Sequence, residues 1–233
     1  MSTTVCPTKA ARVTKRAEQI LDGIGIMANP YLTTLTDGSM PLEHFRASQE
    51  QFGFAVTYFA RPMASLISRM DLPGQRLGIL SNIVDEHGDF KPHFFHHATF
   101  RQFLASIGSD DAVRLDALAP APQVDAFNSV LTSVCTMEDM AVGISCLGII
   151  EHAFAGISAT IGSAVVERGW VAQDDLVHYA LHAEIDEQHA EDFFVLVEDT
   201  CDDSRTSCAV DRGLRLGGYV FNRLYTDLYQ LGG

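Results

Sequence analysis

Apolar residues recur every three or four positions along most of the chain, with polar residues between them. This spacing is typical of helices that bury one face, whereas no stretch shows the sustained alternation of a half-buried strand. The pattern breaks where Pro or Gly interrupts it, as at Asn29-Pro30, at Gly108 and in the Ala/Pro-rich segment 117–122. We therefore predict an all-α fold.

The limits of the expected helices follow from these breaks. Pro at a first-turn position favours the start of a helix, and Pro inside a helix predicts a kink. The predicted helices span residues 9–27, 41–70 with a kink at Pro62, 74–90, 94–107 after a bend at Pro92, 124–135, 138–168, 173–199 and 203–228. About seven long helices with short connections describe one bundle, and we expect a single domain over residues 1–233 with residues 1–8 flexible.

The segment 141–166 is almost wholly apolar and long enough to cross a bilayer. Its centre, however, carries Glu151 and His152. A charged side chain at the bilayer midplane is costly unless it has a partner and a task. We therefore interpret the segment as a core helix that is buried on most sides.

Acidic residues outnumber basic residues by 30 to 16, which gives a formal net charge of −14. No Lys/Arg cluster stands out, so the charge argues against nucleic acid and against membrane surfaces as partners. Five cysteines without a CxxC pair indicate neither a disulfide framework nor a thiolate zinc site. The first fifteen residues are polar and lack an apolar signal core, and these features together favour a reducing cytoplasm.

Metal-ligating side chains fall at helical spacing in the predicted helix that begins at residue 74. Glu86 and His93 are seven residues apart, which is about two helical turns. They share one face if the helix stays regular through Pro92. This pair is the first candidate contribution to a metal site.

Two later helices carry further candidates. His182, Asp186 and His189 stand at positions i, i+4 and i+7, and they form a single stripe along one helix. Glu151 lies alone in the apolar helix, where an unpaired carboxylate is hardest to tolerate. A bound metal would supply the missing partner.

The six candidates are three carboxylates and three imidazoles, a set of oxygen and nitrogen ligands suited to iron or manganese. Six ligands fill two sites and leave positions open for O2 and substrate. A ferritin-type di-iron bundle would require two Glu-x-x-His motifs. Only Asp186-Glu187-Gln188-His189 comes near that pattern, so ferritin-type spacing is excluded.

The chain resembles the haem-oxygenase-like di-iron oxidases and oxygenases in the segment Glu86-His87-Gly88-Asp89-Phe90-Lys91-Pro92-His93, in the lone Glu151 and in His182-x3-Asp186-x2-His189. The resemblance implies a seven-helix haem-oxygenase-like bundle that holds two non-haem Fe(II) ions, with Mn as an alternative metal. Its implied ligands are Glu86, His93, Glu151, His182, Asp186 and His189. It also implies that O2 oxidises a small amine- or carboxylate-bearing substrate, that an external electron donor can take part and that the chain forms a homodimer.

One branch of that family departs from this chain. A p-aminobenzoate synthase of the family depends on a lysine one helical stretch after its counterpart of Glu151. Residues 152–166 of this chain contain no lysine. A self-sacrificing lysine is therefore not expected here, and N-oxygenation and C–C cleavage both stay open.

Other residues are candidates for contacts with substrate. Arg61 can clamp a carboxylate through two hydrogen bonds, with a surface salt bridge as the alternative. Tyr58 and Cys146 are further candidates. His96 and His97 follow His93, and we expect them beside the ligands or at the surface rather than on the metal.

Cys146 supports a different function. Thiaminase II shares the fold and has a nucleophilic cysteine a few residues before a glutamate, and Cys146 precedes Glu151 by five residues. A thiaminase II-like hydrolase is therefore an alternative, and a metal-free binding or interaction module on the same fold is another. The hydrolase does not need the stripe that begins at His182, and the binding module would leave Glu151 without a partner.

Overall fold

The computed structural model describes residues 10–199 and 204–232, and these residues contain helices and no strand. The helices are α1 (Ala11–Ile24), α2 (Pro30–Thr36), α3 (Leu42–Tyr58), α4 (Ala60–Ile67), α5 (Leu77–Glu86), α6 (His96–Ser106), α7 (Ala112–Asp116), α8 (Pro122–Thr136), α9 (Met140–Glu167), α10 (Val177–Glu198) and α11 (Ser204–Leu231). Short 3-10 turns lie at η1 (Ile26–Ala28), η2 (Pro73–Arg76), η3 (Gly88–Phe90), η4 (Pro92–Phe94) and η5 (Gln173–Asp175). The all-α prediction is confirmed, and the predicted flexible residues 1–8 lie outside the described residues.

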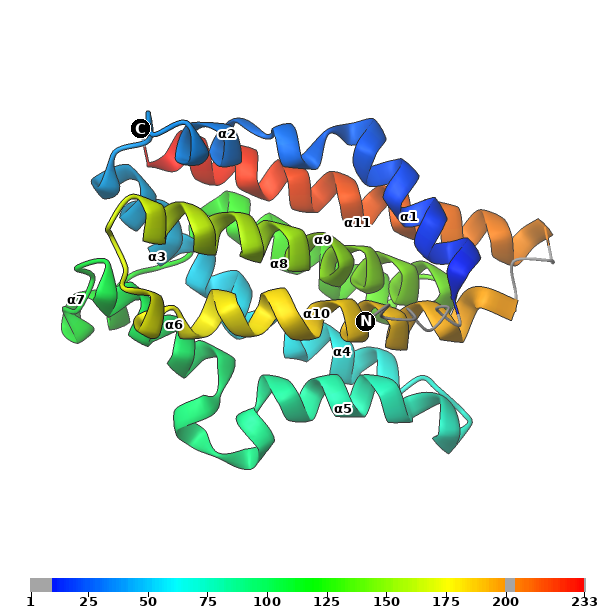
Figure 1. Cartoon of the computed structure of the whole chain (residues 1–233). Coiled ribbons are helices and arrows are strands. Elements are labelled where there is room, and N and C mark those ends of the chain that lie inside the picture. The colour runs from blue at the N-terminus through cyan, green and yellow to red at the C-terminus, as the bar shows by residue number, and fades with distance from the viewer. Residues whose placement is uncertain (1–9, 200–203, 233) are drawn as a thin grey trace, which may run out of the picture.

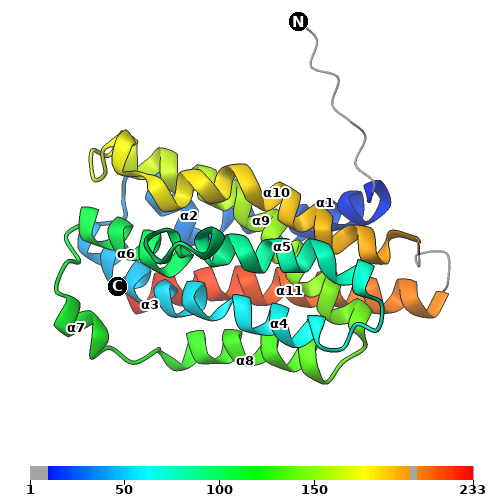
Figure 2. The same cartoon turned by 90° about the horizontal axis from the view of Figure 1, so that it is seen from below.

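Helix α9 is the centre of the bundle. In Figure 1 it runs between α11 and α10, and it contacts both along most of its length. Figure 2 shows α10 and α8 along opposite edges, with α5 between them in that view. Of the most apolar 18-residue stretch of α9, 83% is buried inside the bundle. The apolar segment is therefore a core helix, as its central charge predicted.

Glycines allow the neighbours of α9 to approach closely. A Cβ atom at Gly213 of α11 would lie 2.4 Å from the carbonyl oxygen of Val142, and one at Gly217 would lie 2.5 Å from that of Cys146. No larger residue leaves room for this contact between the two backbones. Gly148 on α9 meets the aromatic side chains of α10 in the same way. The close packing fixes where the polar residues of α9 lie relative to α10.

The helix expected over residues 41–70 is two helices. Helix α3 ends at Tyr58, and α4 begins at Ala60 with Pro62 in its first turn. The ring of a proline clashes with the carbonyl group four residues earlier, which here is that of Tyr58. The break therefore lies one turn before the proline itself. The short helices α2 and α7 lie in segments that the periodicity left as connections.

Candidate metal centre

Three buried acidic and imidazole side chains meet between α9 and α10. Glu151 lies in the middle of α9 and is 3% exposed, and Asp186 and His189 on α10 are equally buried. One potential ligand atom from each residue lies within 4.8 Å of the other two. The spacing of i and i+3 places Asp186 and His189 on the same side of α10. The three residues can hold one metal ion.

His182 extends this cluster by one helical turn. Its Nδ1 atom lies 2.9 Å from Oδ1 and 3.1 Å from Oδ2 of Asp186. The same Oδ1 atom lies 3.6 Å from Nδ1 of His189, which is 3.9 Å from Oε1 of Glu151. The carboxylate of Asp186 thus stands between the two imidazoles of the stripe.

A second carboxylate–imidazole pair comes from α5 and α6. Glu86 is the last residue of α5, and its side chain is 8% exposed. Its Oε1 atom lies 3.0 Å from Nδ1 of His96, the first residue of α6. The ring centroid of His96 is 4.5 Å from that of His182. Glu86 and His96 therefore join the residues of α10 in one cluster.

His93 is not brought to this cluster and is exposed at the surface. After α5 ends, Gly88, Asp89 and Phe90 adopt φ values of 51°, 52° and 64°, in the left-handed region. The chain then restarts as α6 at His96. Because the helix ends at Glu86, the seven residues from Glu86 to His93 do not form two helical turns. The prediction that Glu86 and His93 share one helix face is therefore wrong.

Several buried polar atoms in the cluster lack a hydrogen-bond partner. Among the described residues, these include Oε1 of Glu151, Nε2 of His182 and Nδ1 of His189. A buried group without a partner costs about 1–3 kcal/mol, and such groups are rare in folded proteins. Carboxylate and imidazole atoms are the ligands that iron and manganese accept. The residues present thus fit a metal centre.

The electrostatics of the cluster favour bound protons when no metal is present. Burial raises the pKa of Glu151, and the carboxylates of Asp186 and Glu86 raise it further against the opposing effect of His189. Burial acts in the opposite direction on His189, but Asp186 and Glu151 raise its pKa to about 10. Burial likewise opposes the ionisation of Asp186, yet His182 and His189 hold its pKa below the usual value. A metal cation would displace these protons.

Asp85 contacts His189 from the outside of the cluster. Its Oδ2 atom lies 3.1 Å from Nε2 of His189, and its side chain is 41% exposed. If Nε2 carries the proton and donates it to Asp85, the Nδ1 atom presents its lone pair to the cluster. Carboxylates in this position orient metal-binding histidines and select their tautomer.

A small cavity adjoins the cluster. Four polar residues line one side, namely Glu86, His96, Glu151 and His182. Apolar residues from α3, α8, α9 and α11 and from Phe59, which follows α3, line the rest. The arrangement places an apolar space directly beside candidate metal ligands, as substrate sites generally require.

The two predicted substrate contacts on α3 and α4 do not line this cavity. Arg61 is exposed, and its guanidinium lies 5.2 Å from the ring centroid of Tyr58. The Tyr58 hydroxyl is 2.7 Å from Oγ1 of Thr132, and both residues border a separate surface hollow with Asp125. Arg61 and Tyr58 therefore do not line the cavity beside the cluster, and their contact with a substrate stays a prediction.

Cys146 also lies away from the cavity. It is fully buried on α9, and the cavity lining does not include it. Burial raises the pKa of its thiol, and Cys135 nearby raises it further. A cysteine nucleophile needs an accessible, lowered-pKa thiol. This arrangement is the opposite of the one a thiaminase-like nucleophile requires.

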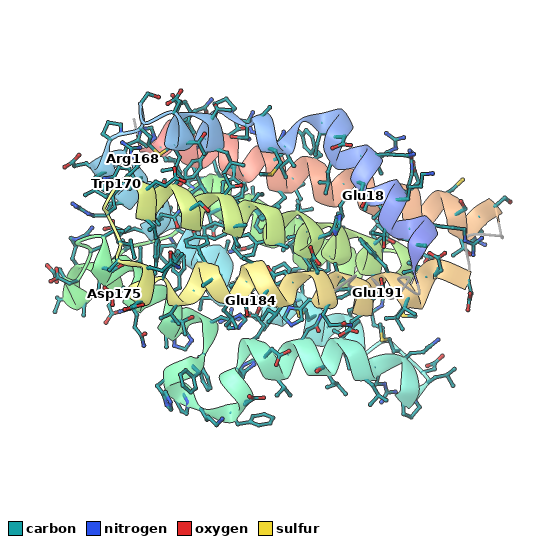
Figure 3. The ribbon with its side chains drawn as sticks, viewed as in Figure 1. Glu18, Arg168, Trp170, Asp175, Glu184 and Glu191 are labelled. Carbon is teal, nitrogen blue, oxygen red and sulfur yellow. The ribbon has the colours of Figure 1, made fainter. Side chains whose placement is uncertain are left out.

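A second hollow lies outside the cluster, between α10 and the segment that connects α5 to α6. Asp85, Asp89, His96 and Glu184 are among its lining residues. In Figure 3, Glu184 lies on the edge of α10 that faces α5. His96 lines both this second hollow, which we call the outer groove, and the cavity beside the cluster. Its side chain therefore separates the two spaces.

Comparison with known proteins identifies the family of this chain. The model of a family described as iron-containing redox enzymes matches residues 46–216. The chain belongs to this family. The 4-aminobenzoate synthase of Chlamydia muridarum (strain MoPn / Nigg) is 21% identical over 182 residues, which cover 78% of this chain and 75% of the relative.

Solved structures show the fold of this chain. A domain of unknown function with a heme oxygenase-like fold from Shewanella denitrificans OS217 superposes with a TM-score of 0.77 at 16% identity, covering 98% of this chain and 94% of the other. A TenA homolog from Pseudomonas syringae pv. tomato str. DC3000 gives a TM-score of 0.74 at 16% identity, with 99% and 96% covered. The predicted haem-oxygenase-like bundle is confirmed.

The structure places His96 beside Glu86, one of the two positions that the sequence leads us to expect for it. Asp85, which contacts His189, is a residue of the cluster that the sequence does not indicate. The signal for His96 was the Gly88 and Pro92 pair between the helices, since both residues interrupt a helix. Nothing in the spacing of Asp85 pointed to a residue about a hundred positions later.

Proposed function

We propose that the chain is an Fe(II)- and O2-dependent oxidase or oxygenase with a two-metal centre, and that Mn can replace Fe. The observation that carries this proposal is the set of buried ligand atoms without partners, described above, which face one another between α9 and α10. The proposed ligands are Glu86, His96, Glu151, His182, Asp186 and His189. His96 takes the place that the sequence assigned to His93, because only His96 lies beside Glu86.

These six residues would hold two Fe(II) ions, which would supply electrons for the reduction of O2. The contribution of the chain is to hold the ligands and to keep water out. Asp85 orients the His189 ring through Nε2. The apolar part of the cavity excludes water next to Glu86 and Glu151, which strengthens the electrostatic interactions there. His96 closes the cavity towards the outer groove.

We also propose that the substrate is a separate small molecule rather than a side chain of the protein. The relatives from Chlamydia bear the name 4-aminobenzoate synthase, but helix α9 of this chain has no lysine after Glu151. The purified protein, supplied with Fe(II), O2 and a reductant alone, should therefore form no 4-aminobenzoate. An external electron donor, a homodimeric assembly and a cytoplasmic location belong to the same proposal.

Anaerobic titration with Fe(II) tests the metal centre. We expect two Fe(II) ions per wild-type chain and O2 uptake when a substrate is present. The Asp186→Ala variant should lose both properties, because this carboxylate contacts the imidazoles of His182 and His189. The Cys146→Ala variant should keep both. A chain that binds no Fe(II) would overturn the proposal. A hydrolytic activity that is lost in the cysteine variant would then favour the thiaminase-like alternative, and metal-independent binding of a ligand or partner by all three proteins would favour the interaction module.

A further inference from the structure

The surface hollow beside Arg61 lies between two helical stripes of polar side chains. These side chains are Thr57, Tyr58 and Arg61 from α3 and α4, and Asp125, Asn128 and Ser129 from α8. Spacings of three and four residues place each set on one face of its helix. The volume of the hollow is about 340 Å³, which falls within the range of about 300–1,000 Å³ for small-molecule sites.

The surface hollow is separate from the cavity beside the metal centre. Within the described ranges, no residue lines both spaces. The residues of α3 that line the cavity are Phe52, Ala55 and Val56, whereas those that line the hollow are Phe54, Thr57 and Tyr58. At 3.6 residues per turn, the two sets lie on nearly opposite faces of the helix. A molecule in the surface hollow is therefore separated from the cavity by α3.

Two opposite charges line the surface hollow without pairing. Over residues 10–199 and 204–232, neither the guanidinium of Arg61 nor the carboxylate of Asp125 forms an ion pair or a hydrogen bond. The guanidinium lies 5.2 Å from the ring centroid of Tyr58, a contact that holds it at the hollow. The guanidinium groups of Arg212 and Arg223, in contrast, each bind a carboxylate. The hollow thus offers both a cation and an anion to a ligand.

Asn128 adds a buried amide to the same lining. This residue is 7% exposed, and its Oδ1 atom accepts no hydrogen bond from the described part of the chain. Thr132, one turn further along α8, donates to the backbone carbonyl of Asn128 and not to this amide. Buried acceptors without a donor are rare in folded proteins. An N–H group of a ligand in the hollow would satisfy this acceptor.

We propose that the surface hollow binds a small amino acid, whose carboxylate contacts Arg61 and whose ammonium group contacts Asp125 and Asn128. A guanidinium matches a carboxylate through two parallel hydrogen bonds. An ammonium group has three donors and no acceptor, so it can serve both a carboxylate and an amide oxygen. A ligand with a single charge would leave one of the two charged side chains unpaired. This binding function goes beyond the proposed oxidase function and needs no metal.

Three compounds of nearly the same shape test the two contacts by ligand-observed NMR titration. L-valine carries both groups, isobutylamine lacks the carboxylate, and 3-methylbutanoate lacks the amine. The protein is used metal-free, because an amino acid can itself chelate a metal ion. We expect L-valine to bind about fivefold or more tightly than either other compound, since each loses one charge-assisted contact. No binding of L-valine at millimolar concentration, or equal affinity for all three compounds, would overturn the proposal.

Two variants assign the groups of the ligand to their partners. Arg61→Gln should remove most of the difference in affinity between L-valine and isobutylamine. Asp125→Asn should remove most of the difference between L-valine and 3-methylbutanoate. Both side chains are exposed and unpaired, so the fold should be retained in each variant, as circular dichroism can verify. If either variant keeps the discrimination that it should lose, the proposed orientation of the amino acid is wrong.

Arg101→Gln is the matched control. Arg101 is an exposed residue of α6 that pairs with Asp116, and it lies outside the lining of the surface hollow. Its replacement changes the net charge by the same amount as Arg61→Gln, so it should leave the affinity for L-valine unchanged. An equal loss in both arginine variants would mean that binding follows the overall charge, and the proposal would fail. Uptake of Fe(II) is measured separately, so failure of this site and failure of the oxidase proposal are distinguishable.

Discussion

Two neighbouring carboxylates in the centre should affect the stability of the metal-free protein in opposite directions. Glu151 is almost fully buried, and its neighbours Asp186 and Glu86 raise its pKa together with burial. Asp186 is equally buried, but His182 and His189 stabilise its charged form. Removing the charge with the isosteric amide should therefore stabilise the protein in Glu151→Gln and destabilise it in Asp186→Asn.

The expected magnitudes follow from the partners that each group has. The folded protein holds a proton on Glu151 at a pH where the unfolded chain releases it, and an amide removes this cost, with an expected gain of about 1–3 kcal/mol in the free energy of unfolding. Breaking a buried pair leaves a charge without its partner and costs about 3–5 kcal/mol. For a domain of this size, each kcal/mol corresponds to a shift in Tm of about 2–4 °C. The two variants should thus differ by about 8 °C or more.

The pH dependence gives an independent check. In the unfolded chain, Glu151 loses its proton at its ordinary pKa of 4.5. In the folded protein the pKa is raised, so the proton stays bound to higher pH. Wild-type stability therefore falls as pH rises from 4.5 to the folded pKa, and the advantage of Glu151→Gln grows over the same interval. Asp186, whose folded pKa is lowered, contributes stability above 3.8 that is lost as pH falls through the folded pKa.

Thermal unfolding followed by circular dichroism at pH 5 and pH 8, with a chelator present, measures these effects. With metal present at pH 8, the wild type should have a higher Tm than Glu151→Gln. Metal binding stabilises the wild type, whereas the glutamine variant lacks the ligand. If both variants shift Tm in the same direction at pH 8 in the metal-free state, or if Glu151→Gln costs more than about 1 kcal/mol, the account of the cluster is wrong.

Three further predictions concern the ligands. Asp85→Leu should lower the metal affinity measured by calorimetry about 10- to 100-fold, while Asp85→Asn, which can still accept from His189, should stay within a few-fold of wild type. His96→Ala should lose one metal ion per chain in elemental analysis and His93→Ala should keep both, whereas the reverse result would mean that residues 87–95 refold when metal binds. Metal affinity should rise with pH between about 6.5 and 10, because His189, with a pKa of about 10, must release its proton before it can bind a metal. Calorimetric titration in buffers of different ionisation enthalpy measures the number of protons released.

Periodicity alone could predict the helices that supply most of the centre. The stripe from His182 to His189 needs only a regular helix, and α10 is regular over that stretch. Glu151 was identifiable because a lone carboxylate in an apolar helix requires a partner. In both cases the relevant geometry lies within one helix, where sequence distance determines position.

The rest of the centre depends on where helices end and on how they meet. The relation of Glu86 to His93 assumed that one helix continues, but three left-handed residues end it. The contact of Asp85 with His189 depends on the packing of α5 against α10, which no local pattern specifies. The position of Arg61 away from the cavity has a similar origin, because the break between α3 and α4 at Phe59 precedes it.

The distance between α9 and α10 should matter to the metal more than the distance between α9 and α11. A Cβ atom at Gly148 would lie 2.6 Å from the Phe194 ring and would separate α9 from α10, and one at Gly217 would meet the backbone of α9 from α11 at 2.5 Å. Both glycine-to-alanine variants should lower Tm, since each overpacks a tight contact. Only Gly148→Ala should also lower metal affinity, because Glu151 and Asp186 stand on the two helices that it separates. Calorimetric titration of both variants decides the point: equal losses of affinity would mean that the centre depends on global stability rather than on this one interface.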